Sequence, residues 1–266
     1  MNGGRGSDAA HDAIGGTYRE YRRPDARIAG AITRALGDAR TAVNVGAGAG
    51  AYEPRDRSVV AVEPSLTMIR QRPEGSAPVV QASARQLPFR DGTFAAALAV
   101  LTVHHWPERA QSLTELARVA HDRVVVVTWD PSSVAFWLTD EYFPEIVAID
   151  RRIFPTMEEL RQTLGRVEVQ RLPIPHDCSD GFLGAYWRRP RAYLDAGVRS
   201  AISTFTKLRD SEPGLVRLRK DIEDGTWKRR YGHILNEGEL DLVSHRHRQR
   251  RARVTGQPAP WPRWAR

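Results

Sequence analysis

The chain has 266 residues, of which 41% are hydrophobic and 27% are charged, a composition typical of a globular protein with a sizeable core. It contains one cysteine, Cys178, and its apolar runs are shorter than a membrane span, so we expect a cytoplasmic protein without disulfides or membrane segments. The formal charge of +8 is concentrated in residues 244–266, which contain seven arginines and no acidic residue. The rest of the chain is nearly neutral, which does not favour a nucleic-acid partner.

The first half of the chain predicts an α/β fold. Residues 1–16 show no apolar periodicity, which predicts a disordered leader, and a helical pattern follows over residues 17–37. A second helix is expected over residues 106–120. Short apolar runs predict five strands, at residues 42–45, 59–62, 78–80, 94–101 and 124–127. Because these runs do not alternate with polar residues, we expect a parallel sheet with helices on both faces.

The second half departs from this alternation. Residues 157–164 indicate a helix and residues 167–174 a sixth strand. Residues 176–235 have largely helical periodicity and predict an insertion that covers a site, before a short last strand at residues 239–243. Residues 244–266 predict a disordered basic tail, so the folded domain is expected to span residues 17–243.

A glycine-rich turn, GAGAG at residues 46–50, directly follows the first predicted strand. Gly46 and Gly48 have no Cβ atoms, which lets the backbone turn tightly and approach a ligand. Glu63 ends the second predicted strand, where a carboxylate can accept hydrogen bonds from both hydroxyls of a ribose. Together they predict a nucleotide-type cofactor, although the spacing differs from the Gly-x-Gly-x-x-Gly pattern of dinucleotide sites.

With SARQLPFRDGTF at residues 83–94 and LTVHHW at residues 101–106, this pattern resembles the class I S-adenosylmethionine-dependent methyltransferases, most closely the type 11 family. The resemblance covers about residues 17–130. It implies a Rossmann-like, doubly wound and mostly parallel seven-stranded sheet, with a helical insertion before the last strand. The implied cofactor is S-adenosylmethionine and the implied product S-adenosylhomocysteine. The residues expected to contact the cofactor are Gly46, Ala47, Gly48, Glu63, Pro64, Ser83, Ala84, Thr102, Tyr21 and Arg22. For Tyr21, the alternative is that its ring anchors the first helix to the core.

Three positions depart from the family pattern. Asn44, Ser83 and Ala95 stand where an acidic residue is usual. Asn44 and Ser83 keep hydrogen-bonding groups, so we expect weaker or rearranged cofactor binding rather than its loss.

The acceptor half of the site is expected just beyond the fourth strand. An acceptor such as a phenol or a protonated amine must lose a proton, and His104 or His105 is a candidate base. The alternative is that both histidines only pack and form hydrogen bonds within their loop. No metal site is expected, because His176 and Cys178 lack a second pair of ligands. Aromatic and polar candidates for the acceptor wall, which could equally form a hydrophobic core, are Trp106, Trp137, His176 and Tyr186.

The sequence therefore favours a cytoplasmic methyltransferase that acts on a small molecule, as in secondary metabolism, with oxygen, nitrogen or carbon open as the receiving atom. One alternative is an RNA methyltransferase whose arginine-rich tail contacts phosphates. Another is a noncatalytic cofactor-binding or interaction protein, suggested by Asn44, Ser83 and Ala95. The sequence does not indicate the oligomeric state.

Overall fold

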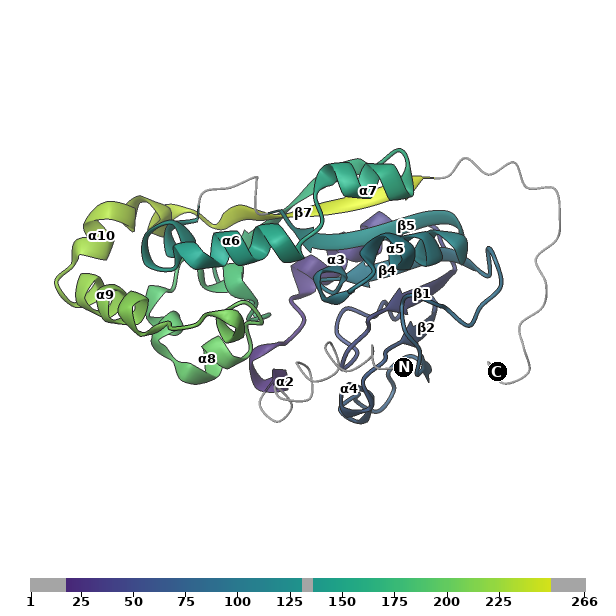
Figure 1. Ribbon diagram of the computed structural model, residues 1–266, viewed down its shortest axis with the longest axis horizontal. Helices are drawn as coiled ribbons and strands as arrows, with labels where there is room; N and C mark the ends of the chain where they lie inside the picture. The colour runs from purple at the N-terminus through teal and green to yellow at the C-terminus, as the bar shows by residue number, and fades with distance from the viewer. Residues whose placement is uncertain (1–17, 131–135, 250–266) are drawn as a thin grey trace.

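The computed structural model describes residues 18–130 and 136–249. One part of the molecule is a sheet with helices packed on its faces, and the other is a group of short helices at one end of that sheet (Figure 1). None of the described helices is long and apolar enough to cross a bilayer.

The sheet has the strand order β3-β2-β1-β4-β5-β7-β6. Its five parallel strands form the Rossmann-like part, and the predicted parallel α/β core is confirmed there. The other two strands, β6 (Glu168–Pro175) and β7 (Glu239–Gln249), are antiparallel to their neighbours, and β7 lies between β5 and β6. The parallel strands are β1 (Thr41–Val45), β2 (Ser58–Val62), β3 (Val79–Val80), β4 (Phe94–Val100) and β5 (Ala120–Trp129).

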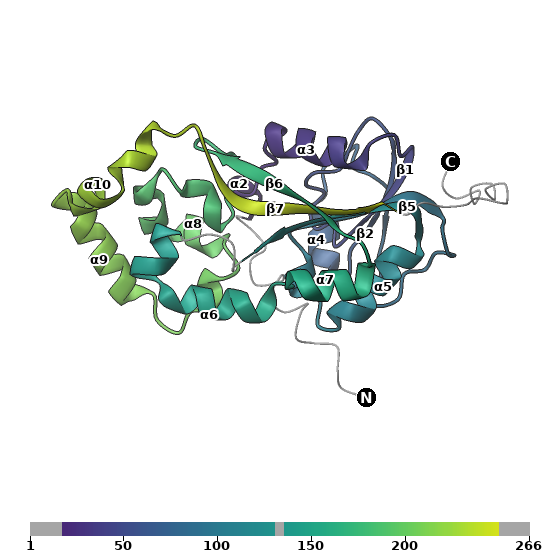
Figure 2. The ribbon, with the colours of Figure 1, turned by 90° about the horizontal axis from the view of Figure 1, so that it is seen from above.

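Helices cover both faces of the sheet. The helix α3 (Ala26–Leu36) lies on one face, whereas α5 (Arg109–Arg118) and α7 (Met157–Leu164) lie on the other (Figure 2). Two hydrophobic cores result, because successive strand residues point to opposite faces. Strands that are buried on both faces explain why their sequences read as continuous apolar runs.

The predicted helix over residues 17–37 is two helices, α2 (Tyr18–Tyr21) and α3. Pro24 disfavours helical backbone in the residue before it, and Asp25 then caps α3 by accepting a hydrogen bond of 2.9 Å from the backbone N–H of Arg27. The chain therefore turns between the two helices, and this break brings Arg22 to the end of the sheet.

The connection from β1 to β2, residues 46–57, consists of turns. The backbone N–H groups of Gly46 and Ala47 both donate to the carbonyl of Val62, at 2.8 and 3.1 Å. The glycine-rich turn is therefore held against the carboxyl end of β2. A short helix, α4 (Leu66–Arg70), follows that strand.

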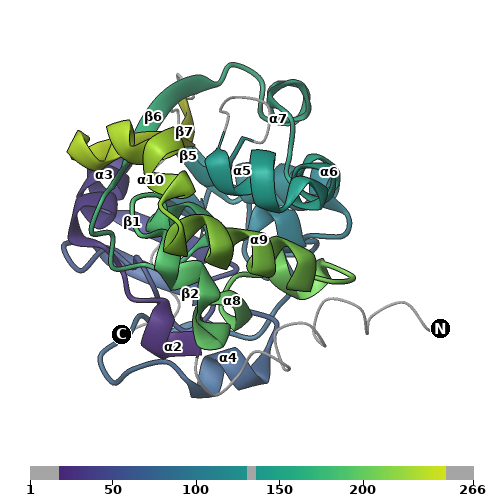
Figure 3. The same cartoon turned by 90° about the vertical axis from the view of Figure 1, so that its left-hand side faces the viewer.

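Two segments far apart in the sequence form the group of short helices, here called the helical lobe (Figure 3). One segment, residues 136–153, follows β5 and contains the π-helix η2 (Leu138–Tyr142) and α6 (Pro144–Ile153). The other, residues 183–236, lies within the insertion expected between β6 and β7. Its elements are η3 (Leu183–Tyr186), η4 (Pro190–Leu194), α8 (Ala196–Ser200), η5 (Phe205–Lys207), α9 (Glu212–Glu223), α10 (Thr226–Tyr231) and η6 (Gly232–Asn236).

The last strand extends to Gln249, six residues past its expected end. Ser244 pairs with Thr128 of β5, and Arg246 pairs with Val169 of β6, so residues 244–249 belong to the sheet and not to a basic tail. A strand with neighbours on both sides forms backbone hydrogen bonds whatever its side chains are. The polar sequence SHRHRQ therefore gave no sign that these residues form a strand. The expected leader and the remainder of the expected tail lie outside the described residues.

Candidate functional site

The glycine-rich turn sits where β1 lies between β2 and β4, the point at which the strand order reverses and open α/β sheets bind ligands. Gly46 and Gly48 have positive φ angles of 71° and 54°, which side chains disfavour. A Cβ atom at Gly46 would overlap the side chain of Thr102, which follows β4. Glycine at position 46 therefore allows the ends of β1 and β4 to approach closely.

Glu63 is fixed against this turn. Its side chain is buried, and Oε2 accepts a hydrogen bond of 2.8 Å from the backbone N–H of Gly48. Oε1 accepts one of 3.0 Å from the backbone N–H of Ser65. Each carboxylate oxygen can accept a second hydrogen bond. The residues present therefore fit a nucleoside whose two ribose hydroxyls donate to Glu63.

The other residues expected near the cofactor lie around the same strand ends. Ala47 and Ala84 are buried, whereas Pro64 is exposed. Ser83 is partly buried, and its Oγ accepts a hydrogen bond of 3.3 Å from the backbone N–H of Arg85. The short side chain at position 83 thus stabilises its own turn.

Tyr21 and Arg22, at the end of α2, contact the helical lobe and the segment that leads to it. Arg22 Nε donates to Oδ1 of Asp180 at 2.5 Å, and the carbonyl of Tyr21 accepts from the backbone N–H of Gly181 at 2.8 Å. The ring of Tyr21 lies against Gly197, where a Cβ atom would overlap it. These contacts hold α2 beside the carboxyl end of the sheet.

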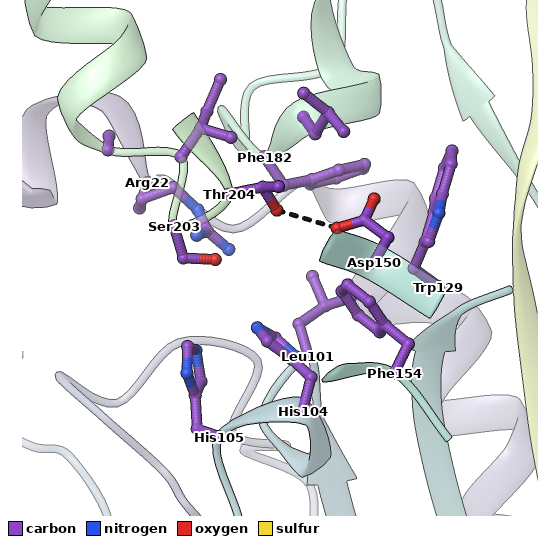
Figure 4. Close-up of a pocket in the computed structure, with 13 residues that line it drawn as sticks. Arg22, Leu101, His104, His105, Trp129, Asp150, Phe154, Phe182, Ser203 and Thr204 are labelled. Atoms are coloured by element: carbon purple, nitrogen blue, oxygen red, sulfur yellow. Dashed lines mark hydrogen bonds between the residues drawn. The ribbon is translucent and has the colours of Figure 1, made fainter. Parts of the chain in front are cut away.

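A pocket lies between the ends of β4 and β5 and the helical lobe (Figure 4). Arg22, His104 and His105 belong to it, so the structure brings three of the predicted site residues together. Most of its wall is apolar. The thirteen described lining residues are Arg22, Leu101, His104, His105, Trp129, Asp150, Phe154, Phe182, Leu183, Ala201, Ile202, Ser203 and Thr204.

Both candidate bases are held in the short helix η1 (Val103–His105) that follows β4. The backbone N–H of His105 donates to the carbonyl of Thr102 at 2.8 Å. The two imidazole rings are 3.9 Å apart between centroids, and His104 also stacks on Phe154 at 4.3 Å. The pocket thus has two adjacent imidazoles on the wall next to Thr102 and the glycine-rich turn.

Asp150 is a pocket residue that the sequence analysis missed. It lies on α6 with 2% of its surface exposed, and Thr204 Oγ1 donates a hydrogen bond of 3.0 Å to its Oδ1. Burial raises the pKa of Asp150 to about 7, against the opposing effects of Thr204 and of the charge on Lys207. The sequence does contain a signal for Asp150, because this carboxylate lies on the buried face of an amphipathic helix together with Ile146 and Ile149.

The four residues expected to form the acceptor wall are not among those that line this pocket. Trp137 and Tyr186 are buried within the helical lobe, where Trp137 Nε1 donates to the carbonyl of Trp187 at 2.8 Å. Trp106 belongs to the core on the face of the sheet that α5 and α7 cover. His176 contacts the carbonyl of Gly238 through Nδ1, at 3.1 Å. Packing accounts for the burial of the three aromatic residues.

Comparisons with known proteins agree with this arrangement. A family profile described as a methyltransferase domain matches residues 43–128. The structure is similar to a protein of Anabaena variabilis assigned as a methyltransferase from an antibiotic biosynthesis pathway. The two share 33% identity and a TM-score of 0.78 over 85% of this chain and 98% of that chain. The YcgJ protein of Bacillus subtilis is 15% identical with a TM-score of 0.51, over 84% of this chain and 98% of that chain, and it shares the fold. A search of the curated proteins finds no match.

Proposed function

Since this chain belongs to the S-adenosylmethionine-dependent methyltransferases of the type 11 family, we propose that it methylates a small molecule held in the pocket between the sheet and the helical lobe. The observation that carries this proposal is the pocket itself, a largely apolar site whose polar groups include two imidazoles and a carboxylate. Such sites, with few polar groups on apolar walls, are typical of small-molecule binding. The antibiotic-pathway assignment of the Anabaena variabilis protein also supports a small acceptor.

We further propose which residues hold the cofactor. S-adenosylmethionine supplies a methyl group made electrophilic by a positively charged sulfur. Gly46, Ala47 and Gly48 would pass beneath its methionine moiety, and Glu63 would bind the ribose. Thr102 would close the site from the end of β4, because its side chain meets Gly46. Further cofactor contacts are assigned to Pro64, Ser83, Ala84, Tyr21 and Arg22.

The chain's own residues must orient the acceptor, exclude water and remove a proton where the acceptor carries one. The apolar walls of the pocket exclude water. His104 or His105 would accept the proton, since both line the pocket beside the cofactor turn. The stacking of His104 on Phe154 holds that ring in one orientation.

One argument for an RNA substrate, the arginine-rich tail, is weakened. Arg246 and Arg248 belong to β7, and the backbone of that strand pairs with β5 and β6. An arginine-rich tail that begins at residue 244 therefore does not describe this chain. The noncatalytic alternative is not supported either, because the family is one of enzymes.

Two measurements test the proposal. Calorimetric titration should show micromolar binding of S-adenosylmethionine and S-adenosylhomocysteine and none of NAD. Transfer of a labelled methyl group should then reach members of a panel of small acceptors and not total RNA. Labelling of RNA alone, with a steep dependence on salt, would replace the small-molecule proposal with an RNA substrate.

A further inference from the structure

The pocket contains a buried carboxylate with unused capacity to accept hydrogen bonds. Asp150 lies on the same wall as Thr204, across the pocket from His104 and His105 (Figure 4). Among residues 18–130 and 136–249, one hydrogen bond reaches its side chain, from Thr204 Oγ1 to Oδ1. Oδ2 is therefore left for a ligand in the pocket.

The positive groups nearby do not neutralise this carboxylate by contact. Arg22 also lines the pocket, but its guanidinium is paired with Asp180. Lys207, at the end of η5, acts on Asp150 through its charge, and no ion pair joins the two within the described part of the chain. An isolated buried carboxylate is costly, so a ligand that brings its own positive charge would relieve that cost.

Aromatic rings surround the same space. Phe154, Phe182 and Trp129 line the pocket, and the face of an aromatic ring attracts an organic cation. A carboxylate together with aromatic walls fits a ligand that has an ammonium group on an apolar body. The other polar residues that line the pocket are Arg22, His104, His105, Ser203 and Thr204.

We propose that Asp150 binds the amino group of the acceptor, so that this enzyme acts on small amines with an apolar body. The inference rests on the proposed function, because it names the substrate class of the same pocket. Thr204 is a positioning residue in this proposal, since its hydroxyl orients the carboxylate.

The raised pKa of Asp150 adds a dependence on pH. With a pKa of about 7, the carboxyl group is mostly protonated at pH 6 and mostly ionised at pH 8. An ammonium ligand pairs with the ionised form, so its affinity should increase about tenfold over this range. His104, His105 and Arg22 face the same space, and Lys207 acts on Asp150 through its charge. A variant without the carboxyl group separates the effect of Asp150 from theirs.

The test uses the full chain saturated with S-adenosylhomocysteine and calorimetric titration with matched probes. The probes are phenethylamine with 2-phenylethanol, and hexylamine with hexanol. At pH 8 at least one amine should bind tenfold or more tightly than its alcohol. Asp150→Asn should remove this preference and leave the affinities for the alcohols and for S-adenosylhomocysteine unchanged. Asp177→Asn is the matched control, because Asp177 is exposed and pairs with Arg27.

The outcomes distinguish the two proposals. Equal affinities for amines and alcohols, no detectable amine binding, or a preference that persists in Asp150→Asn would overturn the inference. If only acceptors without an amino group are methylated, the inference fails and the proposed function stands. Failure to bind S-adenosylhomocysteine would count against the proposed function instead. Should Asp150→Asn not fold, Thr204→Val should lower amine affinity severalfold without affecting alcohol binding, and an unchanged amine affinity would overturn the inference.

Discussion

Tyr52 donates a hydrogen bond of 2.9 Å to Asp180, and this contact links the connection between β1 and β2 to the segment that leads into the helical lobe. Tyr52 belongs to the connection that begins with the glycine-rich turn, whereas Asp180 precedes the second segment of the helical lobe. The other oxygen of Asp180 accepts from Arg22, a pocket residue. Tyr52 has a positive φ of 59°, which is costly for a bulky side chain. We attribute the persistence of this conformation to the buried hydrogen bonds of its hydroxyl.

Replacing Tyr52 with phenylalanine tests this link. Tyr52→Phe removes the donor to Asp180 and the acceptor of the Asp25 backbone N–H, which lies 3.2 Å away. Leaving buried polar groups unpaired should lower the free energy of unfolding by about 1 to 3 kcal/mol, measured by urea denaturation. The exposed pair of Arg27 and Asp177 is the control, and Asp177→Asn should cost no more than about 1 kcal/mol. Equal losses in both variants would contradict a special role for the buried link.

A comparison of variants at Gly46 and Gly75 separates the cost of backbone strain from the cost of a steric overlap. Both have positive φ angles, of 71° and 77°, but a Cβ atom at Gly75 would meet nothing within 4 Å. Gly75→Ala should therefore cost about 1 to 2 kcal/mol, from backbone conformation alone. Gly46→Ala should cost about 2 to 5 kcal/mol, because its Cβ atom also overlaps Thr102, and it should weaken S-adenosylhomocysteine binding. Thermal unfolding and calorimetry measure both effects, and similar results for the two variants would contradict the close approach.

Glu63 is the sharpest test of the cofactor assignment. Glu63→Ala removes the proposed ribose contacts and the hydrogen bonds from the backbone N–H groups of Gly48 and Ser65. The affinity for S-adenosylhomocysteine should fall by at least about tenfold, since bonds to a charged acceptor contribute about 1.5 to 3 kcal/mol. Glu63→Gln should be intermediate, because an amide has one acceptor oxygen. The exposed Glu74 provides the control. If Glu74→Ala lowered the affinity as much as Glu63→Ala, the proposed role of Glu63 in binding the ribose would be wrong.

Asp150 should also make stability depend on pH. Its pKa is raised to about 7 from an ordinary value of 3.8, so between these values the folded chain binds more protons than the unfolded chain. Stability from this group is therefore lost as the pH rises. From pH 5 to pH 8 the native protein should lose about 3 kcal/mol relative to Asp150→Asn. Urea denaturation at both pH values measures this difference, and Asp38→Asn, at an exposed position, should follow the native protein. Parallel curves for the native protein and Asp150→Asn would show that the carboxyl group is not perturbed.

The two histidines can be separated by their effects on turnover and on cofactor binding. If one is the base, its replacement by alanine should lower kcat by about 100-fold or more. The affinity for S-adenosylhomocysteine should stay within about threefold, because proton removal is not needed to bind the product. His121→Ala, a partly exposed histidine beside Asp122, is the control. Full activity in both His104→Ala and His105→Ala would leave the pair with a packing role.

Local patterns in the sequence were enough to predict the parallel core and the position of the glycine-rich turn and Glu63 at the ends of its strands. The strands β1, β2, β4 and β5 are buried on both faces, so their apolar runs are visible without any structure. The glycine-rich turn and Glu63 lie at the ends of adjacent strands. When two parallel strands are neighbours in a sheet, their carboxyl ends lie side by side, and this does not depend on how the rest of the chain folds.

The pocket proposed for the acceptor could be recognised only from the tertiary structure. Asp150 and Thr204 are 54 residues apart and meet only when both segments of the helical lobe pack together. Trp137 and Tyr186 were expected in the acceptor wall, but an aromatic side chain in a sequence indicates burial and not the cavity it faces. Likewise, residues 244–249 have the composition of a solvated tail, but they extend β7 because β5 and β6 offer backbone partners on both sides. The sequence by itself determined the features that depend on neighbouring residues and on periodicity. The pocket was decided by contacts between segments that are distant in the sequence. The free energy of such contacts depends on tertiary packing, which no local pattern encodes.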